Sequence, residues 1–134
     1  MVIMEPQMNA DERRLNPITE QVIACAYRVS NELGCGFLEK CYKNAMFVDL
    51  THSGLLAQAE HPITVKYRGA VVGEYFADLL VAGEILVEIK AVKSLDDVHT
   101  AQCINYLRAT GLKICLLINF GRSKIEIKRI VHNL

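Results

Sequence analysis

Two acidic residues and a lysine near the middle of the chain have the types and spacing of a hydrolytic site that uses a metal ion. Glu88 and Lys90 are two residues apart, so on a strand both side chains project from one face. A turn at Ala82-Gly83 would bring Asp78 nearly opposite Glu88, where facing Cβ atoms lie roughly 4.5–5.5 Å apart. Two carboxylates at that separation can share one cation, and the ammonium group can position a nucleophile or stabilise developing charge. The three residues therefore predict Mg2+-assisted hydrolysis of a phosphodiester.

The same hairpin also has a simpler interpretation. An amphipathic strand commonly carries a Glu-x-Lys pair on its solvent-facing side while its apolar residues, here Ile85, Val87 and Ile89, face a core. A carboxylate on the neighbouring strand would then be solvated as well. The choice between the two interpretations depends on the rest of the chain.

Helical periodicity predicts three helices. Their expected boundaries are Asn16 to Gly34, about Leu38 to Gly54, and Ser94 to Gly111. The first is expected to begin at Asn16 because this is a capping residue that Pro17 follows in the first turn. Glycine ends each helix in the expected place.

Five strands are predicted, four from a hydrophobic period of two and Lys113–Asn119 from a nearly continuous apolar run that indicates a buried strand. They are Ala57–Tyr67, Val71–Val81, Ile85–Val92, Lys113–Asn119 and Lys124–Val131. Turns at Arg68-Gly69 and Ala82-Gly83 predict that the first three form an antiparallel meander. The element order is ααβββαββ, and helices must cover the sheet, so we expect an α/β fold with helices flanking a sheet rather than a β-barrel.

Length and composition are those of a single globular domain. The 134 residues are 51% hydrophobic and 22% charged, and no apolar run reaches the ~18 residues of a membrane span. We expect residues 1–15 to be a flexible lead-in and residues 16–134 to form the domain. No apolar run near the start resembles a signal peptide, so we expect a cytoplasmic location.

The cysteines favour the same location. The chain has five, an odd number, with no CxxC pair, so we expect reduced thiols. A zinc site built from Cys35, Cys41 and a distant histidine has unsuitable spacing, and no second cysteine pair follows.

The charge balance limits the expected partners. The chain has 15 basic and 15 acidic residues, whereas a dedicated DNA-binding module usually has a basic excess. Ten of the 15 basic residues nevertheless follow residue 60. We therefore expect weak, salt-sensitive binding of nucleic acid that depends on a divalent ion, and a homodimer or larger complex is compatible with it.

A motif at the start of the second helix carries a family resemblance. Residues 36–42 read G-x-x-E-x-x-Y, with Gly36, Glu39 and Tyr42 in the three defining positions. This resembles the GxxExxY protein family, a branch of the PD-(D/E)XK nuclease superfamily. Three further segments match in order, namely residues 88–92, 102–106 and 116–121, and the resemblance runs from about Asn16 to the C-terminus. One departure is Ala77, which stands where the superfamily name has proline.

The resemblance implies a restriction-endonuclease-like core and a divalent metal site. Asp78 and Glu88 would bind Mg2+ or Mn2+, and the main-chain carbonyl of Ile89 would be a third ligand. Lys90 would be the catalytic lysine. The proline before the aspartate is not needed for ligation, so Ala77 leaves these roles intact.

Two helices would complete the site. The resemblance implies that Glu39 orients metal-bound water or joins a second metal. Gln102 would contact substrate phosphate or hold the catalytic lysine, with Tyr106 one turn further on. Glu39 and Tyr42 lie three residues apart, and Gln102 and Tyr106 four, so each pair shares a helix face. Both tyrosines fit core packing as well as substrate contact, and His99, one turn before Gln102, could also face the site.

The resemblance and the residues together predict a Mg2+- or Mn2+-dependent nuclease that acts on DNA rather than RNA. One alternative is a catalytically silent nucleic-acid or protein interaction module that retains the fold, which the neutral charge favours. Another is a metal-dependent hydrolase of a smaller phosphoester. The sequence leaves these alternatives open, because sites on one fold diverge.

Overall fold

The computed structural model describes residues 9–134. Helix α1, Ala10–Leu33, begins seven residues earlier than predicted, so the expected cap at Asn16 is wrong. Asn9 is the actual cap, because its side chain accepts a hydrogen bond from the Glu12 amide at 2.8 Å. Pro17 lies inside the helix. The predicted flexible lead-in, 1–15, falls on residues 1–8, which lie outside the described residues, and on the first turns of α1.

The other two helices lie close to their predicted positions. Helix α2 is Glu39–His52 and helix α3 is Asp97–Thr110. Asp96 caps α3 by accepting from the Val98 amide, and His99 completes a capping box with the Asp96 amide. Gly111 ends α3 in the left-handed region at φ 74°.

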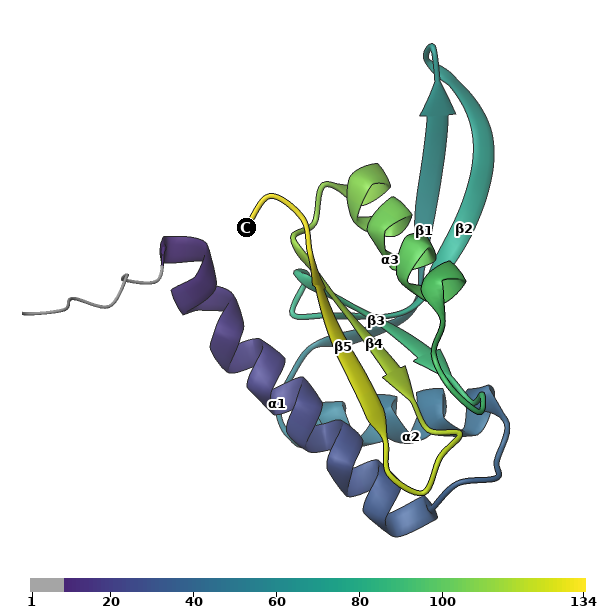
Figure 1. Ribbon diagram of the computed structural model, residues 1–134. Coiled ribbons are helices and arrows are strands. Elements are labelled where there is room, and N and C mark those ends of the chain that lie inside the picture. Colours follow the sequence, from purple (N-terminus) through teal and green to yellow (C-terminus); the bar gives the residue numbers. More distant parts are fainter. Residues whose placement is uncertain (1–8) are drawn as a thin grey trace, which may run out of the picture.

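Five strands form one mixed sheet in the order β1-β2-β3-β4-β5 (Figure 1). Their bounds are Ala57–Tyr67, Ala70–Val81, Ile85–Lys90, Ile114–Asn119 and Glu126–Val131. The first three pair antiparallel, which confirms the predicted meander. Helix α3 then crosses over, so that β4 pairs parallel to β3, and β5 returns antiparallel to β4. The predicted order ααβββαββ and the mixed sheet flanked by helices are confirmed.

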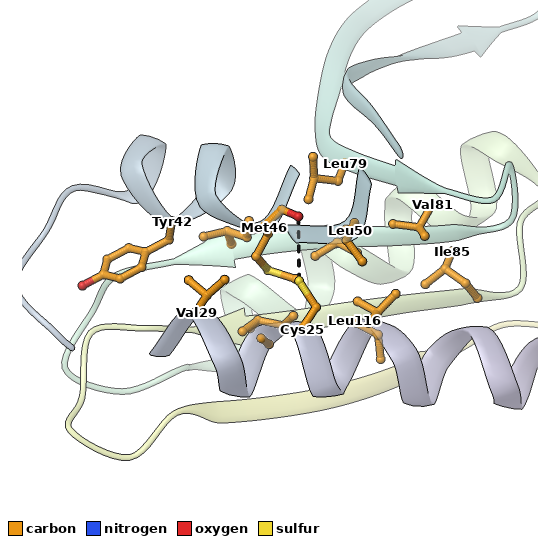
Figure 2. Packing of buried hydrophobic residues seen from close by; sticks show 14 of the residues in the cluster. Cys25, Val29, Tyr42, Met46, Leu50, Leu79, Val81, Ile85 and Leu116 are labelled. Atoms are coloured by element: carbon orange, nitrogen blue, oxygen red, sulfur yellow. Dashed lines mark hydrogen bonds between the residues drawn. The ribbon is translucent and has the colours of Figure 1, made fainter. Parts of the chain in front are cut away.

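A separate apolar layer covers each face of the sheet. Helices α1 and α2 pack on one face, where Val22, Cys25 and Leu50 join inward-facing strand residues such as Ile85. Figure 2 shows this layer, with the Cys25 thiol donating to the Met46 carbonyl at 3.7 Å. Helix α3 packs on the other face, where the buried residues are Ile63, Ala77, Leu80, Leu86, Cys103, Tyr106, Leu107, Cys115, Leu117 and Ile130.

The long β1–β2 hairpin reverses its faces at one point. Leu79 packs with α1 and α2, whereas Ala77 packs with α3, although regular alternation would place both on one face. The pairing of β1 with β2 skips Glu60 and Asp78 at this level, and Glu60 has φ 56°. The kink carries the outer part of the hairpin past the end of α3 (Figure 1). Asp78 therefore lies where β2 leaves the regular sheet.

No helix within residues 9–134 is long and apolar enough to cross a membrane.

Candidate active site

Asp78 and Glu88 meet where strands β2 and β3 separate. The register of β2 and β3 pairs Leu79 with Val87, so the next facing pair would be Asp78 and Glu88, but the ladder stops before them. Beyond this point the two strands are joined by hydrogen bonds from main-chain amides to side-chain carboxylates. Glu88 Oε1 accepts from the Asp78 amide at 2.9 Å, and Asp78 Oδ2 accepts from the Ile89 amide at 2.7 Å. These reciprocal hydrogen bonds fix both carboxylates at the same opening in the sheet.

Burial makes this pair electrostatically unfavourable without a cation. Glu88 is only 4% exposed, so the interpretation of the hairpin as a solvated strand does not hold for this residue. Burial, and then the nearby charge of Asp78, raises the pKa of Glu88 from 4.5 to about 8. Burial also raises the pKa of Asp78. A divalent cation would relieve both effects, and hard oxygen donors suit Mg2+ or Mn2+, so the residues present fit such an ion.

The Ile89 carbonyl is directed toward the same opening. The Lys90 carbonyl accepts a hydrogen bond from the Phe120 amide at 2.8 Å, so the main-chain groups of Lys90 are directed toward β4. Alternate residues of a strand direct their main-chain groups to opposite sides, and the Ile89 amide reaches Asp78 accordingly. The geometry therefore gives Ile89 the orientation expected of a third oxygen donor.

Lys90 follows directly after this group, with its side chain half-buried. Its positive charge lowers the pKa values of both Asp78 and Glu88, so it lies close to the two carboxylates. Its ammonium group makes no hydrogen bond or ion pair with any residue between 9 and 134. A lysine near two acids, yet without a fixed partner, is available to a bound phosphate or water.

The chain after Lys90 is held by one buried side chain that sequence reasoning gave no role. Asn119 is fully buried, accepts from the amides of Val92 and Gly121, and donates to the Val92 carbonyl. Its amide also donates to Glu126 at 2.9 Å. Gly121 is required here because a Cβ atom would overlap the main chain of Val92. Asn119 and Gly121 belong to residues 116–121, one of the segments that carry the family resemblance. They thus fix the part of the chain that follows Lys90.

Glu39 approaches the carboxylates from the start of α2. Its Oε1 accepts from the Ala91 amide at 3.4 Å, and its charge raises the pKa values of Asp78 and Glu88. A cleft of ≈ 560 Å³ contains Glu39 and Asp78, together with Lys43. The structure thus brings the predicted helix acid to the edge of the site.

Lys43 and Glu60 are two residues of this cleft that sequence reasoning missed. They form an ion pair at 2.9 Å, and only 13% of the Lys43 side chain is exposed. The Lys43 charge lowers the pKa of Asp78. The signal for Lys43 was its position one turn after Glu39 on the same helix face. Glu60 gave no signal, because only the kink in β1 brings it there.

Tyr42 lies in the core and not on the wall of the cleft. It is fully buried and its ring stacks on Phe120 at 4.6 Å between centroids. Its hydroxyl donates to the Gly34 carbonyl at 2.7 Å and accepts from the Phe37 amide at 3.1 Å. Gly36, within the same loop, has φ 113°, which favours glycine. The tyrosine therefore fixes the loop that leads into α2 and so positions Glu39.

The residues predicted on α3 divide into two groups. Gln102 donates to the Tyr106 hydroxyl at 3.0 Å, and Tyr106 is 7% exposed. Burial, and then the charge of Glu88, raises the pKa of Tyr106, so this tyrosine lies near the carboxylates. Gln102 thus reaches the site through Tyr106. His99 is occupied in the capping box at the start of the helix.

Within residues 9–134, no group of three or more His, Cys, Asp or Glu side chains is arranged to hold a metal ion. This finding gives no support to the zinc alternative. It also means that Glu39 does not form a three-carboxylate cluster with Asp78 and Glu88. Main-chain oxygen and water would have to complete the coordination of an ion. All five cysteines are free, and Cys35 is exposed.

Comparison with known proteins identifies relatives of this arrangement. A family model described as the PD-(D/E)XK nuclease superfamily matches residues 16–130. No curated protein sequence matches the chain.

Two solved structures have a similar fold. One is a protein named SSO0001, with 21% sequence identity and a TM-score of 0.56 over 91% of this chain. The chain spans 61% of that protein. The other is an alkaline exonuclease, LHK-Exo, from Laribacter hongkongensis, with 15% identity and a TM-score of 0.52. That match covers 94% of this chain and 73% of the exonuclease. At these identities the likeness establishes the fold.

Proposed function

Because the chain belongs to the PD-(D/E)XK nuclease superfamily, we propose that it is a Mg2+- or Mn2+-dependent nuclease that cleaves phosphodiester bonds in DNA. The observation that carries the proposal is the pair Asp78 and Glu88, two buried carboxylates hydrogen-bonded to each other's strands beside Lys90. The exonuclease activity named for LHK-Exo is consistent with the same reaction type.

Each residue has a role in this proposal. Asp78, Glu88 and the Ile89 carbonyl bind the ion, which when bound would polarise a phosphoryl oxygen and supply an activated water. Lys90 holds the attacking water or stabilises the charge that develops on the phosphate. Glu39 accepts a hydrogen bond from that water. Since burial raises the pKa of Glu88, this carboxyl group would have to lose its proton to hold an ion, so the affinity of the site for Mg2+ or Mn2+ is expected to increase with pH.

Three finer assignments accompany the proposal. We assign the chain to the GxxExxY branch, because Tyr42 fixes the loop that contains Gly36 and so positions Glu39 at the edge of the site. We propose a cytoplasmic location from the free thiols. A homodimer would supply two sites, one for each strand of a duplex.

A binding module without catalysis is the second candidate. The formal net charge of zero favours it, because a nuclease acting alone usually has a basic surface for its substrate. This candidate predicts no divalent-ion binding at the carboxylates, which calorimetry on the wild-type protein measures directly.

The nuclease proposal is tested with a cleavage panel of linear, nicked, branched and single-stranded DNA, and RNA, in Mg2+, Mn2+ or EDTA. Wild type is compared with Glu88→Gln and Lys90→Ala. We expect metal-dependent cleavage by the wild type and a loss of at least about 100-fold in each variant, the range for removing a group that stabilises a transition state. Glu20→Gln on α1 and Lys128→Ala on β5, both exposed, are matched controls with wild-type cleavage.

Two outcomes would reject the proposal. Cleavage that survives Glu88→Gln and Lys90→Ala would place the activity at another site. Absence of detectable Mg2+ and Mn2+ binding by the wild type in calorimetry would favour the binding module instead.

A further inference from the structure

A second hollow, larger than the cleft beside Glu39, lies between α3 and the outer part of the β1–β2 hairpin. It has a volume of ≈ 1180 Å³ and includes residues 61–66 of β1 and several exposed residues of α3. Figure 1 shows the hairpin rising beside α3, and residues of both elements line the hollow. We call this hollow the hairpin groove.

The charge of the hairpin groove differs from that of the chain as a whole. Lys66 contributes a positive charge from the hairpin wall and Arg108 one from the α3 wall. Among the described residues that line the groove, none is an aspartate or a glutamate. The chain as a whole has equal numbers of acidic and basic residues. An exclusively basic groove in a neutral protein is complementary to a polyanion.

The groove also offers aromatic faces. Tyr75 is 50% exposed, and its ring lies 5.9 Å from that of Tyr106, tilted by 47°. The amides of Gln102 and Asn105 are further polar groups along the α3 wall. Stacking on an exposed ring requires a free base face, which an unpaired nucleotide has and a base pair within a duplex lacks. Cations on both walls together with an exposed aromatic ring are typical of a groove for a single strand.

The hairpin groove leads toward the carboxylates. Leu86 packs in the α3 layer, and side chains two residues apart on a strand share a face, so Glu88 faces α3 as well. Tyr106 lines the groove, and its hydroxyl group interacts electrostatically with Glu88 and Asp78. A strand that lies along α3 would therefore reach the opening between β2 and β3.

We propose that the hairpin groove holds an unpaired strand of the DNA substrate, with Tyr75 stacking on a base and with Lys66 and Arg108 contacting its phosphates. The assignment of this strand as substrate rests on the proposed nuclease function, whereas its binding does not. The kink at Asp78 is then the feature that joins the groove to the candidate metal site.

The test is fluorescence anisotropy with a labelled oligodeoxynucleotide in EDTA, where cleavage cannot occur. The wild type should bind the single strand at least about tenfold more tightly than the matching duplex. Tyr75→Ala should weaken single-strand binding by about tenfold, since stacking of one base contributes about 1–3 kcal/mol. Arg108→Ala should weaken it as well. All variants are compared by circular dichroism to verify that they fold.

Each variant has a matched control. Phe76→Ala removes a neighbouring aromatic residue that is 61% exposed and lies outside the groove lining, and Arg13→Ala removes an exposed arginine on α1, across the sheet. Both should bind as the wild type does.

Equal or tighter binding of the duplex, tighter binding of single-stranded RNA, or equal losses in Tyr75→Ala and Phe76→Ala would overturn the proposal. If the groove variants lose binding but the wild type cleaves nothing, the groove stands and the nuclease function fails. If the wild type cleaves and the groove variants bind normally, the nuclease function stands and the proposal for the groove fails.

Discussion

At the scale of single residues, Glu88 has the most unusual environment in the site. It is a carboxyl group that the fold buries beside a second carboxyl group, Asp78. Such an arrangement destabilises the protein whenever both groups are charged and no cation is present. Natural proteins retain destabilising groups of this kind chiefly at functional sites. The burial of Glu88 therefore has a measurable consequence that does not depend on knowing the substrate.

We predict that the metal-free protein loses stability as the pH rises from about 5 to 8. The pKa of Glu88 is about 8 in the folded state, above its ordinary value of 4.5. Below pH 4.5 the carboxyl group is protonated in both states and its folded environment carries no penalty. As the pH rises, the unfolded chain releases this proton first. Each pH unit within that window then lowers the free energy of unfolding by about 1.4 kcal/mol.

Urea unfolding in EDTA across this pH range measures the effect. Glu88→Gln should flatten the decline, whereas Glu20→Gln, at an exposed position on α1, should follow the wild type. Adding Mg2+ at pH 8 should restore stability to the wild type and not to Glu88→Gln. The hydrogen bonds from Arg28 lower the pKa of Asp49, so its contribution to the free energy of unfolding is lost only in more acidic solution, below this pH range. A wild-type stability that is level from pH 5 to 8 would contradict the assigned environment of Glu88.

At the scale of elements, the sequence predicted the order and approximate limits of all three helices and five strands, because periodicity and glycine stops are local signals. It misplaced the start of α1, since Asn16 and Pro17 imitate a helix start that Asn9 provides. It also could not predict the kink at Glu60 and Asp78, because the face reversal depends on packing against α3 and on pairing between distant segments.

The candidate site likewise contains residues that local sequence patterns indicated and residues whose role depends on contacts between distant segments. Asp78, Glu88 and Lys90 could be grouped from strand spacing and one turn, and the structure places them together. The parts that Lys43 and Asn119 play depend on how α2 and β4 meet β3, so the helix position of Lys43 one turn after Glu39 was not enough to assign it. Their contacts join residues that are distant in the chain, 17 positions apart in the 2.9 Å ion pair between Lys43 and Glu60 and 27 positions apart for Asn119 and Val92.

Tyr42 provides the prediction that belongs to the scale of elements. Its hydroxyl group joins the Gly34 carbonyl and the Phe37 amide, and so fixes the loop between α1 and α2. Tyr42→Phe keeps the ring stacked on Phe120 but leaves both main-chain groups without this partner. We expect the free energy of unfolding to fall by about 1–3 kcal/mol.

Chemical denaturation measures this loss. Tyr27→Phe on α1, where the side chain is 46% exposed, is the matched control and should change stability by less than about 0.5 kcal/mol. Because the loop leads into Glu39, Tyr42→Phe should also lower the cleavage rate while Mg2+ affinity at Asp78 and Glu88 stays close to wild type. Equal stability of the two tyrosine variants would show that the hydroxyl group does not hold the loop.

At the scale of the whole molecule, the important property is the separation of charge and not its sum. The net charge is zero, yet the hairpin groove has basic residues on both walls, and neither carboxylate of the site belongs to its lining. A polyanion is then attracted into the groove and repelled from the metal-free site. A divalent ion at the carboxylates removes that repulsion, so ion binding and strand binding should support each other.

The salt dependence of binding tests this arrangement. Release of counterions gives a slope of about −0.7 in a plot of log affinity against log salt for each phosphate of a single strand that is neutralised. With Lys66 and Arg108 as the two groove cations, we expect a slope of about −1.4 in EDTA. Arg108→Ala should make it shallower by about 0.7, and Arg13→Ala should leave it unchanged. Adding Mg2+ should raise the affinity of the wild type and not that of Glu88→Gln, because only the wild type can hold the ion that links the groove to the site. A slope that Arg108→Ala leaves intact would show that the strand follows another surface, and the neutral charge of the chain would then count in favour of the binding module.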